Sequence, residues 1–365
     1  MGFRCGIVGL PNVGKSTLFN AITAAGAEVA NYPFCTIEPN VGVVAIPDRR
    51  VERLTALYHP PRVVPSAIGF VDIAGLVRGA SAGEGLGNQF LAHIREVDAI
   101  AHVVRCFDDP HVVHVDGSVD PERDIGVVET ELIFKDLETV ERRLADVQRR
   151  ARSGDRKAGA EEAHLVRLRE HLLGGRLARY CQPASEDEQL WMRDAHLLTA
   201  KPVMYVCNVQ EGEIANGNNH VRSVRAIAAR EDAAVVVVSA SIEAEIAALP
   251  ADDRPAFLDH AGLKESGLDR VIRGGFDLLR LITFFTAGPK EVHAWTIPRG
   301  TTAPAAAGVI HSDFERGFIR AEVMAFQDLD RLGTEHAVRD AGLLRIEGRD
   351  YTVGDGDVMY FRFNV

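Results

Sequence analysis

Residues 9–17 are the stretch of this sequence whose residue types and spacing most clearly indicate chemistry. They read Gly-Leu-Pro-Asn-Val-Gly-Lys-Ser-Thr and match G-x-x-x-x-G-K-[ST] without a mismatch. Such glycines let successive backbone N–H groups face a chain of phosphates, and the start of the following helix adds partial positive charge. Lys15 would reach the outer phosphates, and the Ser16 hydroxyl would ligate Mg²⁺. The predicted phosphate cradle comprises Asn12, Val13, Gly14, Lys15, Ser16 and Thr17.

Two later segments predict the rest of a metal and phosphate site. The apolar, strand-like run 67–71 ends in Asp72-Ile73-Ala74-Gly75. In P-loop proteins such an aspartate holds Mg²⁺, usually through water, and the glycine N–H reaches the γ-phosphate. A loop rich in proline and asparagine carries Thr36 at the place where a threonine hydroxyl often completes the Mg²⁺ shell. We therefore predict Ser16, Thr36 and Asp72 as metal ligands and Gly75 as a catalytic group.

The loop after this aspartate is rich in glycine, with glycines at positions 79, 83, 85 and 87. So many glycines make the loop too permissive to be rigid by itself. Such a segment suits a switch that becomes ordered when a γ-phosphate is present and relaxes afterwards. The alternative is an ordinary flexible loop.

Two strand ends further along the chain indicate where a base is read. One apolar strand is followed by Asn208-Val209-Gln210-Glu211, and another is followed by Ser239-Ala240-Ser241. Guanine-binding proteins carry Asn-Lys-x-Asp at the first position, because the Asp carboxylate accepts from two neighbouring N–H groups of guanine. Here Val209 replaces the lysine, and the acid is the longer Glu211. Adenine presents a ring acceptor beside an amino donor, so the altered motif weakens the case for guanine.

The elements that must position these residues follow an α/β pattern that is interrupted once. Strands are expected at 3–8, 41–46, 67–71, 99–107, 202–207 and 234–238. Between Glu122 and about Thr199, leucine and valine recur at helical spacing, with a break at 153–155, which predicts an inserted antiparallel helical pair. From about Thr283 short strands alternate with turns, which predicts a small mixed α/β domain. This last part is typical of an interaction module.

Length and composition limit the classes of function. A chain of 365 residues suggests two or three domains. The net charge of −11 argues against a protein that coats DNA or other nucleic acid indiscriminately. A local basic run does lie between Arg142 and Lys157, although such a run is equally typical of a solvated helix face.

The same features indicate the compartment. No run of about 18 uncharged apolar residues predicts a membrane span, and we expect no signal peptide before the first strand. The five cysteines are scattered, and no pair has metal-ligand spacing. A reducing cytoplasm is therefore the expected setting.

These motifs resemble those of the Obg-like ATPase family, whose bacterial members are called YchF. The resemblance is carried by residues 9–16, by Asn-Tyr-Pro-Phe-Cys-Thr-Ile-Glu-Pro-Asn at 31–40 and by the closing Tyr-Phe-Arg-Phe-Asn-Val, and it extends over essentially the whole chain. It implies a P-loop G domain at 1–121 and 200–282, a helical coiled-coil insertion at 122–199, and a C-terminal TGS domain of β-grasp, ubiquitin-like fold at 283–365. It also implies slow hydrolysis of ATP, preferred over GTP.

The resemblance further implies roles for partners and for individual residues. The expected partner is the ribosome, as the whole particle or through its large subunit, with ribosomal RNA as one contact. Members of this family lack the water-orienting glutamine after Asp-x-x-Gly and carry a hydrophobic residue instead, a pattern that Leu76 matches. His114 matches a histidine used in hydrolysis, although the residues alone favour a solvated loop histidine. Asn12 matches an asparagine that helps to hold K⁺ in potassium-dependent relatives. The family's base contacts map onto Phe107, Asn208, Val209 and Ser239.

We therefore expect a monomeric, cytoplasmic, Mg²⁺-dependent ATPase that acts as a nucleotide-gated, ribosome-associated factor in translation or stress. Lys15, His114 and Gly75 are its expected catalytic groups. One alternative is a GTPase of the same fold, which competition between ATP and GTP would identify. Another is a nucleotide-sensing adaptor in which hydrolysis is incidental. A variant that binds but cannot hydrolyse ATP, and yet retains its cellular activity, would favour the adaptor.

Overall fold

The computed structural model describes residues 2–26, 40–73, 91 and 93–364. The predicted Thr36, Gly75, Leu76 and glycine-rich loop lie outside these residues. Contacts within the chain divide it into two compact units. The first unit comprises residues 1–27, 37–42 and 69–275, and the second comprises 28–36, 43–68 and 276–365.

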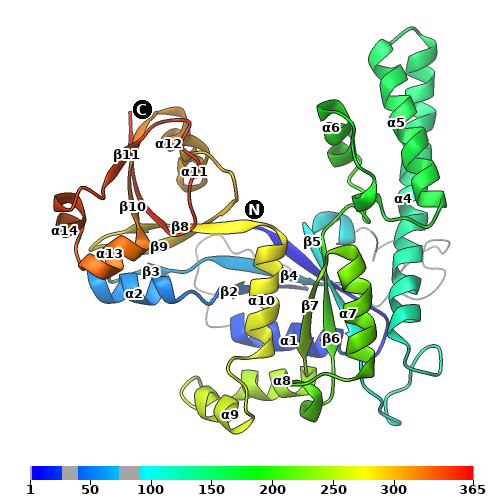
Figure 1. Cartoon of the computed structure of the whole chain (residues 1–365), viewed down its shortest axis with the longest axis horizontal. Helices are drawn as coiled ribbons and strands as arrows, with labels where there is room; N and C mark the ends of the chain where they lie inside the picture. The colour runs from blue at the N-terminus through cyan, green and yellow to red at the C-terminus, as the bar shows by residue number, and fades with distance from the viewer. Residues whose placement is uncertain (1, 27–39, 74–90, 92, 365) are drawn as a thin grey trace. The chain divides into compact units, whose positions relative to one another are not determined.

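A six-stranded sheet with the order β2-β4-β1-β5-β6-β7 forms the centre of the first unit (Figure 1). The pairs β1–β4, β1–β5, β5–β6 and β6–β7 are parallel. Parallel strands end at the same edge of a sheet, so the loops that follow them gather there. The strands are β1 (Arg4–Val8), β2 (Val41–Ala45), β4 (Ala67–Asp72), β5 (Ala99–Arg105), β6 (Val203–Asn208) and β7 (Ala234–Val238).

Helices and short 3₁₀ turns surround this sheet, and the strands are buried as apolar runs. All seven residues of β5 are buried, as expected for a central strand covered on both faces. Val224 of α7 and Ile246 of α8 pack with Val104 of β5 and Cys207 of β6 in one apolar core. The surrounding elements are α1 (Lys15–Gly26), η3 (Glu211–Glu213), α7 (Asn219–Glu231), α8 (Ala240–Ala248), α9 (Arg254–His260) and α10 (Gly267–Leu278).

Two long helices, α4 (Pro121–Arg152) and α5 (Arg156–Leu173), form the antiparallel pair that we call the arm (Figure 1). Asp120 caps the start of α4, and Asp155 caps the start of α5 by accepting from the Lys157 N–H at 2.9 Å. The turn between them needs a glycine, because Gly154 has φ of +94°. The seam contains Val140, Leu144, Val147, Leu165, Leu168 and Leu172, all buried. The predicted helical pair is thus present.

The chain returns from the arm to the sheet through η2 (Ala178–Tyr180) and α6 (Glu186–Asp194). The buried Asp136 of α4 fixes this return, since its carboxylate accepts from the N–H groups of Leu198 at 2.7 Å and Thr199 at 2.8 Å. The arm is therefore tied to the sheet at a point well along α4. Among the described helices, none combines the length and apolar character needed to cross a bilayer.

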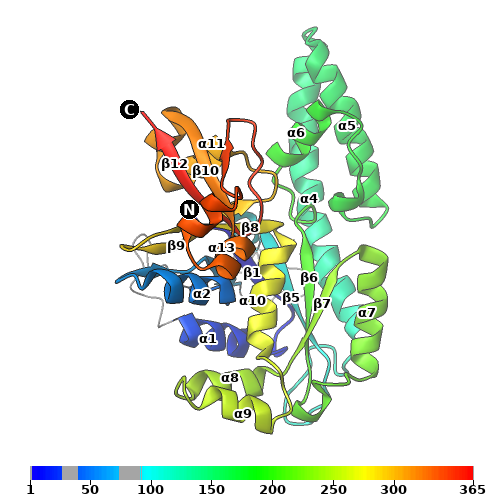
Figure 2. The ribbon, with the colours of Figure 1, turned by 60° about the vertical axis from the view of Figure 1, so that its left-hand side comes forward.

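The second unit contains another six-stranded sheet, with the order β11-β10-β12-β8-β9-β3. Apart from the parallel β12–β8 and β3–β9 pairs, its pairs are antiparallel, and β10 lies beside β12 in Figure 2. Its strands are β3 (Val63–Val64), β8 (Leu281–Ala287), β9 (Val292–Pro298), β10 (Phe318–Ala325), β11 (Arg345–Glu347) and β12 (Asp357–Phe363). Its helices are α2 (Arg49–Tyr58), α11 (Ala303–Ile310), α12 (Ser312–Arg316), α13 (Phe326–Leu332) and α14 (Glu335–Asp340).

Both faces of the second sheet are covered. Alanines of α11 pack on one face, against Phe284 and Ile297. On the opposite face, Leu54 of α2 packs with Phe285 and Met324. The second unit therefore draws α2 and β3 from the first 70 residues of the chain, which the sequence analysis did not anticipate. The short strands expected after about Thr283 are present, among them β9, β10 and β12, while the proposed domain boundaries remain a prediction.

Candidate nucleotide site

The loop between β1 and α1 has the shape that a phosphate cradle requires. Asn12 and Gly14 have φ of +60° and +98°. A Cβ on Gly14 would lie 2.3 Å from the Nδ2 atom of Asn208, so both the backbone angle and the close approach demand glycine. The Gly14 carbonyl accepts from the Leu18 N–H at 3.0 Å and begins helix α1. Helix α1 therefore starts at Lys15, with Ser16 exposed in its first turn.

Lys15 folds back over the loop that precedes it. Its ammonium donates to the Leu10 carbonyl at 2.6 Å, and the residue is buried. Burial lowers the pKa of Lys15 to about 8, against the opposing effect of the Asp72 carboxylate. A partly desolvated cation that donates to a carbonyl is ready to exchange that carbonyl for a phosphate oxygen.

Asp72 ends β4 and offers a carboxylate oxygen to the same place. Its Oδ1 atom is buried and has no hydrogen-bond partner among the described residues. Burial raises the pKa of Asp72, and the charge of Lys15 opposes this shift. A buried, unpartnered carboxylate oxygen together with the Ser16 hydroxyl fits Mg²⁺, which prefers hard oxygen ligands.

Asn208, at the end of β6, joins three of the site's loops. Its Nδ2 donates to the Val13 carbonyl at 2.9 Å, and its Oδ1 accepts from the Ala240 N–H at 2.9 Å. The predicted base contact is thus also the tether that holds the phosphate loop to the loop after β7. Ser239 is fully buried, and its hydroxyl lies 3.0 Å from that of Ser241.

A cavity of about 410 Å³ opens among these loops. Six predicted residues line it: Asn12, Gly14, Thr17, Phe107, Asn208 and Val209. Five lining residues were missed: Asp109, Val112, Gln210, Ala240 and Ser241. Gln210, Ala240 and Ser241 are sequence neighbours of predicted residues, which was the available signal. Ser239 is not among the lining residues, and Glu211 instead lines a separate cavity with Phe257.

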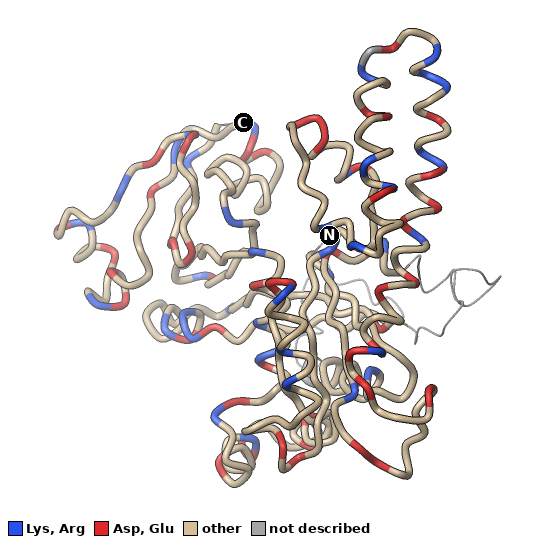
Figure 3. The backbone as a smooth tube through the Cα atoms, turned by 45° about the vertical axis from the view of Figure 1, so that its right-hand side comes forward, with Lys and Arg blue, Asp and Glu red and all other residues tan. Residues whose placement is uncertain are grey.

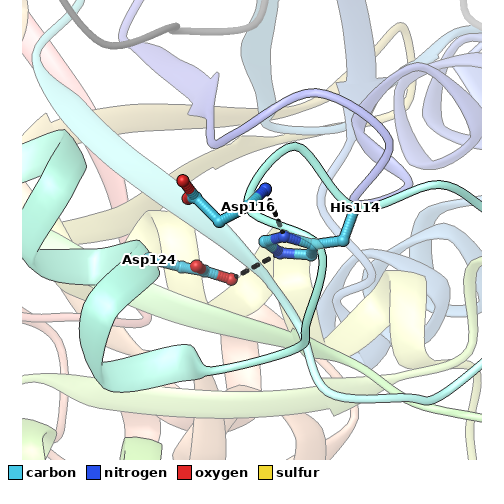
Figure 4. Close-up of side chains that lie close together, drawn as sticks. All are labelled: His114, Asp116 and Asp124. Atoms are coloured by element: carbon cyan, nitrogen blue, oxygen red, sulfur yellow. Dashed lines mark hydrogen bonds and ion pairs between the residues drawn. The ribbon is translucent and has the colours of Figure 1, made fainter.

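His114 lies beside this cavity but does not line it. Figure 4 shows both ring nitrogens engaged: Nδ1 accepts from the Asp116 N–H at 3.1 Å, and Nε2 lies 2.9 Å from Asp124 Oδ2. An amide can only donate, so Nε2 carries the proton and donates to Asp124. The Arg123 guanidinium also contacts Asp124 Oδ1, at 2.9 Å. His114 is therefore a buried, paired histidine in this arrangement, unlike the solvated alternative.

Two family models match this chain. One, described as "50S ribosome-binding GTPase", matches residues 4–140, and the YchF GTPase C-terminal model, described as "Protein of unknown function", matches residues 281–364. The chain is 53% identical over 367 residues to the ribosome-binding ATPase YchF of Bacillus subtilis, with both chains fully covered. The chain belongs to the YchF family. The Escherichia coli O157:H7 ribosome-binding ATPase YchF is 54% identical over 365 residues, again with both chains fully covered.

Solved structures agree with this assignment to the YchF family. The Schizosaccharomyces pombe YchF GTPase superposes with a TM-score of 0.89 at 38% identity, covering 99% of this chain and 98% of that one. A GTP-binding protein from Pyrococcus horikoshii shares the fold at 20% identity, with a TM-score of 0.63 over 99% of this chain and 100% of that one. The predicted mixed α/β P-loop fold is therefore confirmed.

Proposed function

We propose that this YchF chain is a ribosome-associated ATPase that binds ATP with Mg²⁺ and slowly hydrolyses it to ADP and phosphate. The observation that carries the proposal is the pairing of a complete P-loop with a buried, unpartnered carboxylate oxygen on Asp72. The names of the bacterial relatives, ribosome-binding ATPases, support both halves of the function. The described helices contain no membrane-spanning candidate, and we expect a cytoplasmic monomer.

Catalysis would rest mainly on positioning and charge. The Lys15 ammonium exchanges the Leu10 carbonyl for phosphate oxygens, while the P-loop amides hold the remaining charge. Asp72, Ser16 and Thr36 are the proposed Mg²⁺ ligands, and Mg²⁺ would neutralise charge on the phosphates. Gly75 is the proposed γ-phosphate contact. Turnover without the ribosome should be slow because Leu76 cannot orient a water molecule.

Adenine is the proposed base, and Phe107 and Val209 offer it an apolar wall. The replacement of the Asn-Lys-x-Asp pattern by Asn208-Val209-Gln210-Glu211 supports this choice, and Glu211 lines another cavity. Isothermal titration of ATP against GTP tests the proposal. Converting Val209 to Lys together with Glu211 to Asp should shift preference towards GTP without full reversal. Tighter binding of GTP by the unmodified chain would favour the GTPase alternative.

Finer features also remain proposals. The Obg-like family label, a coiled-coil character for the arm and a TGS identity for the second unit follow from the sequence resemblance. The proposed contact between Asn12 and K⁺ has a direct test, since replacing K⁺ by Na⁺ should slow turnover.

The overall function is tested by measuring phosphate release from ATP with and without Mg²⁺ and ribosomes, together with cosedimentation. Mg²⁺-dependent release and ATP-sensitive cosedimentation are expected. A chain that binds ATP tightly but never releases phosphate, even with ribosomes, would favour the adaptor alternative.

A further inference from the structure

Arg105, the last residue of β5, lies behind the wall of the cavity. It is only 2% exposed, and it is not among the residues that line the cavity. Nothing in the sequence analysis singled it out. An arginine so deeply buried is uncommon unless its charge is paired, so its contacts need an explanation.

The guanidinium of Arg105 donates to three carbonyls of the following loop. Nε donates to Phe107 O at 3.1 Å, Nη1 to Val112 O at 2.9 Å, and Nη2 to Asp109 O at 3.2 Å. Phe107, Asp109 and Val112 all line the cavity. The Arg105 Cζ also lies 4.6 Å from the centre of the Phe107 ring. One buried side chain thus supports the three lining residues that this loop contributes.

The partners of the buried Arg105 differ from those of two half-buried arginines, Arg50 and Arg179. Arg50 and Arg179 form ion pairs with carboxylates. Among the described residues, the hydrogen bonds of Arg105 go to backbone carbonyls, and no ion pair with a carboxylate is found. The planar fork of five N–H donors suits three carbonyls that point from different directions, which a lysine ammonium cannot match. The charged guanidinium of Arg105 therefore holds this loop in its conformation.

The same loop is fixed to its surroundings at further points. Asn12 of the phosphate loop donates from Nδ2 to Val113 O at 3.1 Å, and Gln210 donates to Asp108 O at 2.9 Å. The two donors, Asn12 and Gln210, line the cavity as well. With Arg105 in place, residues 107–113 form one ordered wall between the phosphate loop and the segment that follows β6.

We propose that Arg105 is a positioning residue for the nucleotide base, which fixes residues 107–112 and presents Phe107 to the purine. The proposal rests on the proposed function, because it takes the cavity to be the base site. The aromatic ring then has the guanidinium on one side and faces the cavity with the rest of its surface, an arrangement favourable for stacking a purine. Arg105 acts on the base end of the nucleotide, and the phosphate end depends on Lys15 and the P-loop.

The test compares ligands that do and do not carry a base. Arg105→Gln should weaken ATP binding by at least about 10-fold, with a smaller loss for Arg105→Lys, and should reduce the preference for ATP over GTP. Binding of inorganic tripolyphosphate with Mg²⁺ should stay within about 2-fold of wild type. The matched control is Arg270→Lys, because the Arg270 guanidinium also donates to a backbone carbonyl, Val237 O at 2.9 Å, and neither residue lines the cavity.

Each outcome decides the matter. Unchanged ATP affinity in Arg105→Gln, or equal loss for ATP and tripolyphosphate, would overturn the proposal, since the second result indicates a general loss of structure. If Arg105→Gln does not fold, Arg105→Lys retains the charge and the aliphatic stem and carries the same comparison. If the wild-type chain binds ATP no more tightly than tripolyphosphate, the adenosine part adds no affinity. That result would instead contradict the base site itself, and so the proposed function.

Discussion

The polar groups beside the two sheets differ in whether they are paired within the protein. At the carboxyl edge of the first sheet, Asp72 Oδ1 is buried without a hydrogen-bond partner among the described residues, and the Lys15 ammonium donates to a backbone carbonyl. In the second unit, Tyr58 donates to Glu335 at 2.6 Å, and Arg50 bridges Asp48 and Asp355. The first arrangement leaves groups that gain from a ligand, and the second satisfies them within the protein.

This difference follows from how each sheet is covered. A parallel sheet gathers loops at one edge, where backbone and side chains can face a ligand. The mostly antiparallel second sheet has α11 on one face and α2 with α13 on the other, so both faces are used for packing. We infer that the first sheet supplies the chemistry and that the second unit is a stable platform. The following experiments test that division.

The largest expected effect is on stability, from Leu54→Ala in α2. Leu54 is fully buried against the second sheet, and a cavity of this kind costs about 2–5 kcal/mol. Denaturant unfolding should show this loss, while ATP affinity should stay within about 2-fold because the described residues that line the cavity belong to the other unit. Glu52→Gln, exposed on the same helix, is the control. A matching fall in ATP affinity would show that the division of roles is wrong.

Lys15→Ala should lower ATP affinity by at least about 10-fold, or about 1.4 kcal/mol, because it removes a direct contact with the phosphates. Lys201→Ala is a matched control, since the Lys201 ammonium also donates to backbone carbonyls, those of Arg95 and Val97. Calorimetry on both variants makes the comparison. If Lys15→Ala binds ATP with wild-type affinity, the assignment of the phosphate site to this loop is wrong.

The lowered pKa of Lys15 adds a dependence on pH. In the free protein the ammonium is charged below about pH 8 and loses its proton above it. ATP requires the charged form, so affinity should be flat below pH 8 and fall by up to about tenfold per pH unit above it, with proton uptake on binding. Titrations in buffers of different ionisation enthalpy measure that uptake. Affinity that is constant to pH 9.5 would contradict the buried-ammonium account.

His114→Ala should lower kcat by about 10-fold and leave ATP affinity nearly unchanged, as expected for a group that acts in the transition state. Because both ring nitrogens are occupied here, His114 must leave Asp124 to reach the phosphates. Asp124→Asn weakens a charge-assisted bond and should therefore raise the kcat measured without ribosomes. In a His114→Ala background the Asp124→Asn effect should vanish. A persistent effect would mean that Asp124 acts independently of His114.

The sequence predicted the loops at the carboxyl edge of the first sheet better than it predicted the composition of the second sheet, and the reasons are physical. Residues 9–17 and Asp72 could be proposed from the sequence because phosphate and metal binding restrict residue type and spacing. Asp109, Val112 and Arg105 were missed, because their roles depend on where a loop folds back, which short-range patterns do not encode. The place of α2 was missed similarly: its apolar stripe predicts a buried face but not which sheet covers it.

The smallest expected effect concerns the arm, where three residues of the basic run already form ion pairs. Arg143 and Arg150 both contact Glu161, and Arg149 contacts Asp146, so reversing them would disturb the arm itself. Figure 3, in which the backbone is coloured by residue type, shows acidic positions interspersed with basic ones along both helices. Arg142, Arg152 and Lys157 are exposed, and no ion pair to them is found among the described residues.

Reversing only Arg142, Arg152 and Lys157 to Glu should weaken ribosome cosedimentation and flatten its salt dependence, with the slope of log K against log salt falling by roughly one for each lost phosphate contact. The matched control reverses Arg222, Arg225 and Arg230, which are exposed on α7 and change the net charge equally. ATP hydrolysis without ribosomes should be the same in both triple variants, because neither touches the cavity. If the two variants lose ribosome affinity equally, the effect belongs to net charge and the arm is not the contact. If neither variant loses ribosome affinity, the contact lies elsewhere. The second unit, where Ile319 and Ile346 are exposed, is then the surface to mutate next.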